Sequence, residues 1–298
     1  MRRERKKIKI AFMRFPAFKE KALTLSYDDG LKLDEKLVSI MRRNGLKGTF
    51  NLNAGLYPSA PITGNIHAKM TEEECKALFF GTENEVALHG YRHLPLAALD
   101  NVEMVYEVIE DRKALEVTYK KLIRGMAYPN GSYNDDVLKM LKACNIGYAR
   151  TVEDSECFDL PEEWLTLRPT CHHNNPRLME LAREFAELNY GDDWTEDWYA
   201  KTPKLFCLWG HSSEFGRDEN WDVIEEFAAY LGNRNDIWYA TLGEIFEYTQ
   251  AYKNLRFFAD GSGVYNPSAI DVYIFYFGEK YIVRAGTTLE LNKKEKYL

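Results

Sequence analysis

The stretch "KALTLSYDDG" at residues 21–30 decides the fold, because a short apolar run there ends in two adjacent carboxylates and a glycine. A short apolar run that ends in turn residues is typical of a buried strand. A helical pattern follows from about residue 34 to 44, with its apolar residues on one face and Gly45 as its stop. This strand and helix form one βα unit, and the same alternation continues to residue 253.

The later units follow the same pattern. Further strands are predicted at 48–53, 84–89, 125–129, 146–150, 165–169, 204–209 and 237–241. Helices are predicted at 71–81, 100–123, 135–144, 178–188, 221–231 and from 241 onward, with capping boxes at Thr71/Glu74 and Thr241/Glu244. Seven or eight βα units without tandem repeats predict an α/β fold with a parallel sheet, most simply a closed barrel.

The end of the chain has a different pattern. Within residues 254–298, apolar and polar residues alternate around a predicted turn at Gly278–Glu279, which indicates a β-hairpin. We therefore expect three parts: an N-terminal arm (1–20), a barrel (21–253) and a small β appendage (254–298).

Composition excludes several classes of protein. The formal net charge of -7 argues against a general nucleic-acid binder. The basic run "RRERKK" at residues 2–7 is best interpreted as a solvated arm. We expect a soluble, cytoplasmic protein, because no signal peptide is visible and no apolar run reaches the roughly 18 residues of a membrane span. The 5 cysteines lack a CxxC pair, which fits reduced structural thiols. The oligomeric state is left open.

Polar residues stand at the predicted C-terminal end of five strands. Each could have an ordinary explanation, since a DDG triplet favours a turn and a lone histidine is often a packed residue. In a parallel barrel, however, these strand ends converge on the face that carries the chemistry. The residues placed there are Asp28, Asp29, His89, Tyr128, Arg150 and His211.

The motif "HGYRH" at residues 89–93 suggests a metal site. His89 and His93 are four residues apart, which places both imidazoles on one side of a turn, and Pro95 rules out a long helix. Two imidazoles and one carboxylate are a ligand set suited to catalytic zinc or a similar divalent ion. The histidines in "CHHNN" at 171–175 are expected to be solvated loop residues instead.

In this order and at these intervals, "TLSYDDG", "HGYRH", "AYPNGSY" and "LWGH" resemble the motifs of the polysaccharide deacetylase family, the NodB-homology carbohydrate esterases of family 4. The resemblance covers roughly residues 20–250. It implies a distorted (β/α) barrel that removes N-acetyl or O-acetyl groups from saccharides. It also implies one divalent metal ion, for which we expect zinc, with cobalt, nickel or manganese as alternatives.

The resemblance also implies roles for individual residues. Asp28 corresponds to the general base, Asp29, His89 and His93 to the metal ligands, and His211 to the general acid. Beside these, we expect the oxyanion to be held near the Asn130 backbone, and Tyr128 and Trp209 to line the substrate site.

One position departs from the family pattern. The family often has an arginine two residues before the proline of its third motif, where this chain has Ala127. We expect Arg150, on the neighbouring strand, to fill this space and pair with Asp28. Arg168 is the reserve candidate, and the alternative is that Arg150 pairs at the rim with Glu153 or Asp154.

Several functions stay open beside the main one. The substrate could be an acetylated oligosaccharide or polysaccharide, or a small acylated amide as in allantoinase-like relatives. The chain could also be a non-catalytic carbohydrate-binding relative. A phosphotransferase is disfavoured, because its aspartyl-nucleophile pattern needs two aspartates separated by one residue.

Overall fold

The computed structural model describes residues 11–188 and 202–291. The basic run at residues 2–7 lies outside this part of the chain. Among the helices of the described ranges, none is both long and apolar enough to cross a membrane.

The main sheet is parallel and is built around its first strand. Its strands run in the order β6-β5-β4-β3-β2-β8-β7, and β9 also pairs with β2. Strand β2 is buried along its whole length, as expected for a parallel strand covered on both faces. The bounds are β2 Lys21–Asp28, β3 Gly48–Leu52, β4 Glu85–Leu88, β5 Gly125–Ala127, β6 Tyr148–Arg150, β7 Cys171–His172, β8 Lys204–Gly210 and β9 Ile237–Tyr239.

The sheet curls toward a barrel but is not closed by a continuous ladder. Its edge strands are β6 and β7, and the segment between them supplies a single bridge from Leu167 to Arg150. The strand predicted at 165–169 is therefore wrong: a 3-10 turn, η5 (Trp164–Thr166), comes first, and the regular strand begins only at Cys171. The curled sheet confirms the predicted distorted barrel.

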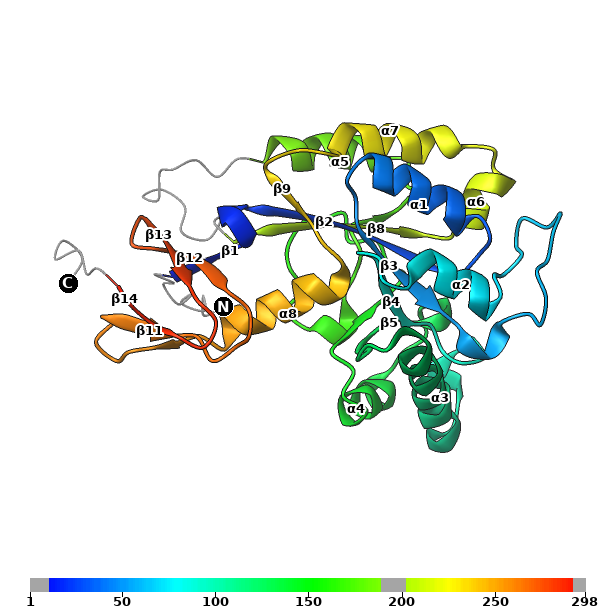
Figure 1. Ribbon diagram of the computed structural model, residues 1–298, viewed down its shortest axis with the longest axis horizontal. Helices are drawn as coiled ribbons and strands as arrows, with labels where there is room; N and C mark the ends of the chain where they lie inside the picture. Colours follow the sequence, from blue (N-terminus) through cyan, green and yellow to red (C-terminus); the bar gives the residue numbers. More distant parts are fainter. Residues whose placement is uncertain (1–10, 189–201, 292–298) are drawn as a thin grey trace, which may run out of the picture.

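Helices cover the outside of the sheet (Figure 1). Their bounds are α1 Asp34–Arg43, α2 Glu72–Phe79, α3 Asn101–Tyr119, α4 Asp135–Ala143, α5 Leu178–Glu187, α6 Ser212–Arg217, α7 Trp221–Leu231 and α8 Leu242–Lys253. Capping boxes are present at Thr71/Glu74 and Thr241/Glu244, as the spacing predicts. The short helix α6 is not predicted, and α3 ends at Tyr119 rather than 123.

Two small antiparallel sheets lie beside α8, at the end of the molecule away from α2 and α6 (Figure 1). One contains β12 (Val272–Tyr276) and β13 (Glu279–Val283), the predicted hairpin, together with β1 (Ala11–Arg14). The hairpin turn is Phe277–Gly278, one residue earlier than predicted. The other sheet contains β10 (Arg256–Phe257), β11 (Gly263–Tyr265) and β14 (Thr288–Glu290). The division of the chain into arm, barrel and appendage stays a prediction.

Candidate metal centre and active site

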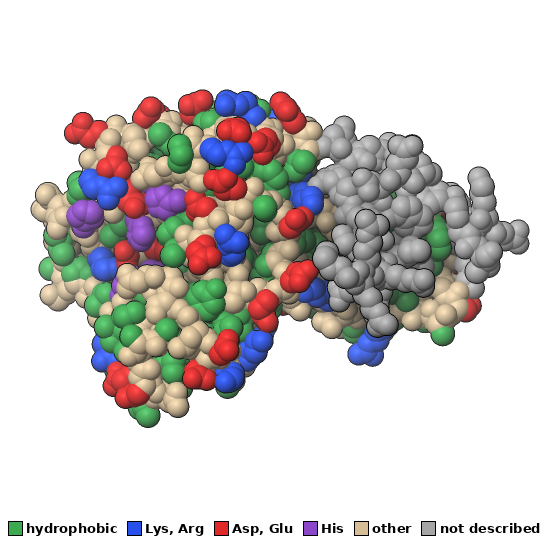
Figure 2. All heavy atoms as spheres, turned by 180° about the vertical axis from the view of Figure 1, so that it is seen from behind, with side chains coloured by type: hydrophobic (Ala, Val, Ile, Leu, Met, Phe, Trp, Pro, Cys, Tyr) green, Lys and Arg blue, Asp and Glu red, His purple; other side chains and the backbone are tan. Residues whose placement is uncertain are grey.

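The strand ends bring the candidate residues together. Asp28 is the last residue of β2, His89 follows β4, Arg150 ends β6 and His211 follows β8. Histidine side chains accordingly gather in one region of the surface, among acidic and basic ones (Figure 2). This is the face at which parallel α/β barrels carry their chemistry.

Asp29, His89 and His93 form a ligand set. Each offers one ligand atom, and these atoms all lie within 4.8 Å of one another. His93 has a φ of 58°, and its imidazole packs edge to face against that of His89, with ring centroids 4.7 Å apart. Two imidazoles and a carboxylate at this separation fit a divalent ion such as zinc.

The tautomer and charge of His89 suit a ligand. Its Nδ1 lies 2.9 Å from the Ala127 carbonyl oxygen, to which it donates. A neutral imidazole carries one N–H, so Nε2 keeps its lone pair for a metal. Burial lowers the pKa of His89 to about 4 despite the nearby carboxylates of Asp28 and Asp29, so the ring is neutral at pH 7.

Two buried carboxylates on α3 hold the loop that carries the histidines. Asp111 accepts the backbone N–H groups of Ala54 at 2.7 Å and of His89 at 3.0 Å. Glu107 accepts from the backbone N–H of Arg92 at 2.8 Å and from its Nε at 2.5 Å. The loop is thus fixed from behind by the helix, independently of any ion.

Asp28 is buried and paired with Arg150. The guanidinium Nη2 donates to both carboxylate oxygens, at 2.5 Å for Oδ2, and Asn51 donates to Oδ1 at 2.8 Å. Burial alone would raise the pKa of Asp28, but Arg150, His89 and His211 together outweigh it and lower the pKa to about 2. Asp28 is therefore ionised at neutral pH.

Arg150 is the register partner of Ala127 on the neighbouring strand. Its Nε donates to Ser26 Oγ at 3.0 Å, its Nη1 to the Thr151 carbonyl at 3.1 Å, and its Cζ lies 4.6 Å from the Trp209 ring centroid. The expected pair with Asp28 is present, and the rim alternative is not. Arg168, the reserve candidate, instead pairs at the surface with Glu153 at 3.5 Å.

His211 faces both aspartates. Its Nε2 lies 4.0 Å from Asp28 Oδ2 and 3.9 Å from Asp29 Oδ2. Its other nitrogen, Nδ1, lies 3.4 Å from Glu214 Oε2, and that oxygen also accepts the His211 backbone N–H at 3.0 Å. Burial lowers the pKa of His211, but Glu214 and Asp28 outweigh it, so the pKa is raised.

The histidines of "CHHNN" are not solvated loop residues, which corrects the expectation. His172 belongs to β7, and His173 is buried with its Nδ1 3.2 Å from the Tyr27 hydroxyl. Both Nε2 atoms face Glu214 Oε2, at 3.1 Å and 3.3 Å. Gly210 is required here, because a Cβ at this position would lie 2.1 Å from His173 Nδ1.

His172, His173 and Glu214 form a second group that could hold a metal ion, and hydrogen bonds also hold its members in place. The backbone N–H of Asn174 donates to His172 Nδ1 at 3.1 Å, so this nitrogen carries no proton in the neutral ring. In the neutral His172 ring the proton is then on Nε2, which donates to Glu214, whereas the buried His173 Nε2 has no hydrogen-bond partner among the described residues. The cluster thus fixes the carboxylate that contacts His211.

The sequence matches one family. The family model described as polysaccharide deacetylase matches residues 16–149. This segment is similar to the polysaccharide deacetylase family. It contains Asp28, Asp29, His89 and His93 and ends just before Arg150. None of the curated proteins matches the chain.

Solved structures with deacetylase names resemble the fold. A structure from Mycobacterium smegmatis, named as a candidate polysaccharide deacetylase, is 19% identical with a TM-score of 0.57, over 83% of this chain and 96% of that chain. The Streptococcus pyogenes deacetylase PplD is 21% identical with a TM-score of 0.42, over 48% of this chain and 61% of that chain. A family 4 carbohydrate esterase pseudoenzyme from Bacillus anthracis is 14% identical with a TM-score of 0.48, over 79% of this chain and 68% of that chain.

The expected substrate contacts differ in exposure. The Tyr128 ring is fully buried and its hydroxyl donates to the Leu165 carbonyl at 2.8 Å, so this side chain packs in the core of the barrel. Asn130 is exposed in the turn Pro129–Gly131. Trp209 is buried against Arg150, and its Nε1 donates to Asp154 at 3.1 Å.

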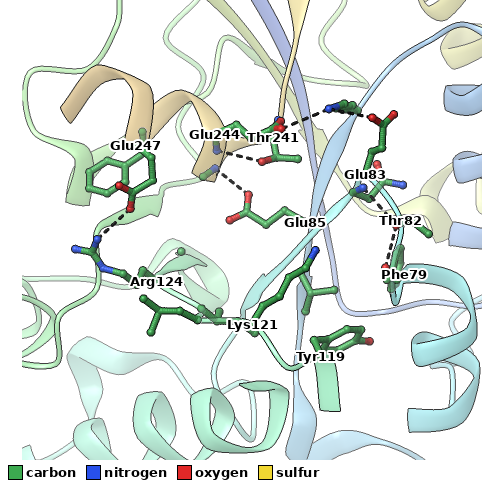
Figure 3. Close-up of a pocket in the computed structure, with 18 of the residues that line it drawn as sticks. Phe79, Thr82, Glu83, Glu85, Tyr119, Lys121, Arg124, Thr241, Glu244 and Glu247 are labelled. Carbon is green, nitrogen blue, oxygen red and sulfur yellow. Dashed lines mark hydrogen bonds and ion pairs between the residues drawn. The ribbon is translucent and has the colours of Figure 1, made fainter. Parts of the chain in front are cut away.

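A cavity of about 430 Å³ lies elsewhere, at the start of β4 and β5, opposite to the strand ends that carry the deacetylase motifs (Figure 3). Its Glu85 accepts from Thr49 Oγ1 and from the Gly243 backbone N–H, both at 2.8 Å. Near its rim, Arg124 pairs with Glu247 at 3.0 Å. These polar groups satisfy one another, and the cavity contains no ligand set.

Sequence reasoning missed several residues of the centre. Glu214 could have been found, because it follows His211 at the spacing of a capping box, with the acidic residue three positions later. Asn51, which binds Asp28, and Lys69, which binds Asp29, have no such signal. Their positions follow only from the way the sheet and the loop after β3 are arranged.

Proposed function

We propose that this chain is a metal-dependent hydrolase that removes acetyl groups, N-acetyl above all, from a saccharide. The observation that carries the proposal is the convergence of Asp29, His89 and His93 into one ligand set, flanked by Asp28 and His211. The family match of residues 16–149 supports the reaction class.

The ligand residues have a clear division of labour in this proposal. Asp29, His89 and His93 would hold one divalent ion, zinc first among the candidates. The ion, when bound, would supply a Lewis acid that lowers the pKa of water and polarises the acyl oxygen.

Asp28 is the proposed general base. Its Oδ1 accepts from Asn51 and Arg150, and its Oδ2, which also accepts from Arg150, faces the ligand side, 3.8 Å from His89 Nε2. We infer that Oδ2 accepts the proton of the attacking water, while Arg150 keeps the carboxylate oriented and ionised beforehand. The Asn130 backbone N–H is the proposed second donor to the oxyanion.

His211 is the proposed general acid. Hydrolysis of an amide places the water oxygen on the acyl carbon, breaks the C–N bond and requires a proton on the departing amine. The Nε2 of His211 lies on the same side as Asp28 Oδ2, and Glu214 favours the protonated ring. His211 can therefore deliver that proton from Nε2.

The proposal is tested by metal analysis of the purified protein combined with acetate release from chitooligosaccharides. We expect about one divalent ion per chain and acetate release by the wild type. Asp28→Asn should retain the metal and lose at least about 100-fold in turnover, the usual contribution of a positioned base. The matched control is Asp136→Asn, because Asp136 pairs only with Lys139 on the surface.

Three results would redirect the proposal. An Asp28→Asn variant with normal turnover would remove Asp28 from the reaction. Metal binding without acetate release from sugars, together with hydrolysis of a small ureide such as allantoin, would favour the non-sugar alternative. Binding of the sugar with neither reaction would favour the non-catalytic relative.

A further inference from the structure

The ammonium of Lys69 lies directly on the candidate metal ligand Asp29. Its Nζ is 2.9 Å from Asp29 Oδ1, 3.0 Å from the Asp29 carbonyl oxygen and 3.0 Å from Asn53 Oδ1. An ammonium has three donors, and here each has an acceptor. Lys69 is therefore held in place as a specific partner and is not a mobile surface charge.

The backbone fixes Lys69 in this position. Lys69 forms an antiparallel bridge with Leu31. Two backbone hydrogen bonds of 2.8 Å flank this bridge: the N–H of Lys32 donates to the Ala68 carbonyl, and the N–H of Met70 donates to the Gly30 carbonyl. The loop before α2 is thus joined directly to the turn that follows the two aspartates.

Asn53 extends the contact to the histidine loop. Its side chain is buried, its Nδ2 donates to the carbonyls of His89 at 2.6 Å and Gly90 at 2.8 Å, and its Oδ1 accepts from Lys69. Lys69 therefore connects the two segments that carry the ligands.

Each carboxylate of the aspartate pair consequently has its own resident cation. Asp28 pairs with Arg150, and Asp29 pairs with Lys69. The two neighbouring negative charges are compensated by the chain itself. A divalent ion would add two positive charges to a cluster whose aspartates are already neutralised.

The oxygen that Lys69 binds is also the one that faces the histidine ligand. Asp29 Oδ1 is the carboxylate oxygen that approaches His93 Nε2, at 3.9 Å. A metal held between Asp29 and His93 would share this oxygen with the ammonium, and like charges at such a range repel even in water.

We propose that Lys69 is a built-in counter-ion of Asp29 that weakens divalent metal binding, so that the centre stays formed without metal and exchanges its ion readily. The inference rests on the proposed metal centre and adds to it a residue that sets the metal affinity. Lys69 is a positioning residue here and takes no part in proton transfer.

The test measures metal affinity directly, by competition of the metal-free protein with a chromophoric chelator for Zn²⁺ and Co²⁺. Lys69→Met removes the charge and keeps the length of the side chain. We expect its Kd to fall about tenfold or more, which corresponds to about 1.4 kcal/mol. Lys69→Gln, a second neutral variant, should shift in the same direction, and Lys69→Arg should stay near the wild type.

The matched control is Lys32→Met. Lys32 follows Leu31, the residue that bridges to Lys69, but its ammonium pairs with Glu74 at 2.6 Å and not with a proposed ligand. Its loss should therefore leave the Kd for the metal unchanged. A second readout is thermal stability in EDTA. The melting temperature of the wild type should rise little on addition of Zn²⁺. Lys69→Met should be less stable than the wild type in EDTA, and its melting temperature should rise more on addition of Zn²⁺.

Two outcomes overturn the inference and are distinguishable. If both neutral variants bind metal with the wild-type Kd or more weakly, Lys69 does not oppose the ion, while the metal centre itself stands. If neither the wild type nor any Lys69 variant binds Zn²⁺ or Co²⁺, the proposed centre fails and this inference fails with it.

Discussion

Replacement of Arg150 by methionine should destabilise the protein strongly, because it leaves a buried carboxylate without its charge partner. Arg150 is fully buried and Asp28 is 2% exposed. Methionine fills much of the space but offers no donors to Asp28, to Ser26 Oγ or to the Thr151 carbonyl. The effect should therefore be electrostatic more than steric.

The magnitude follows from the pKa of Asp28. That pKa is lowered from 3.8 to about 2, which corresponds to about 2 kcal/mol at about 1.4 kcal/mol per pKa unit. This stabilisation is present above pH 4 and is lost as the pH falls from about 4 to about 2. Without Arg150 the cost of burying the charge is no longer offset, so the total loss at pH 7 should reach about 3–5 kcal/mol.

The assay is urea unfolding followed by tryptophan fluorescence at pH 7, in EDTA so that metal binding does not contribute. Asp28→Asn in the Arg150→Met background should recover part of the loss, because it removes the unpaired charge. Arg168→Met is the control, since its partner Glu153 is exposed, and it should change stability by less than about 0.5 kcal/mol. A loss below about 1 kcal/mol for Arg150→Met, or no recovery in the double variant, would refute the reasoning. Arg150→Lys should keep the fold and lower turnover, because an ammonium does not reproduce the planar fork.

Three further predictions concern other parts of the centre. Glu214→Gln should lower turnover about tenfold or more, measured by steady-state kinetics, because it releases His211. The control Glu244→Gln removes a carboxylate with the same helix-capping contact and should affect only stability, measured by urea unfolding. Burial raises the pKa of Asp34 to about 7, so its contribution to stability is complete below about pH 4 and is lost as the pH rises to about 7. Asp34→Asn should abolish this pH dependence and be more stable than the wild type at pH 8 by up to about 4 kcal/mol. Parallel profiles of unfolding free energy against pH for the two proteins would contradict this. Asp111→Asn should weaken Zn²⁺ binding about tenfold by loosening the ligand loop, and an unchanged Kd would show that the loop is held by other contacts.

The fold could be predicted where local signals agree with tertiary packing. Strands such as β2 and β8 are apolar runs that end in polar residues, and the capping boxes mark two helix starts, so both kinds of element lie where expected. The errors fall where a tertiary contact overrides the local pattern. Apolar and polar residues alternate in the segment around Leu167, as in a strand. The segment nevertheless makes only one bridge, because it crosses the gap between the two edge strands.

The centre could be predicted only as far as residue type and strand position determine it. Asp28, Asp29 and His89 stand directly at strand ends, so the topology of a parallel barrel brings them together. Arg150 could be placed by the same reasoning, because β6 neighbours β5. The position of Lys69 depends on the path of a loop, and that of His173 on space left by a glycine at the end of β8, and neither path nor space has a local sequence signal.

Adjacent aspartates at a strand end need not mean that a metal is required for the fold. Asp28 ends β2, and Asp29 begins the turn after it with a φ of 81°. The two carboxylates meet different cations, Arg150 for Asp28 and Lys69 for Asp29. Structural zinc sites form only with their ion, because their ligands have no other partner in the chain. Here α3 anchors the loop of the proposed histidine ligands, Arg150 holds the proposed base Asp28, and Lys69 holds the proposed ligand Asp29. The chain thus supplies the geometry itself, and a bound ion would add only the chemistry of a Lewis acid.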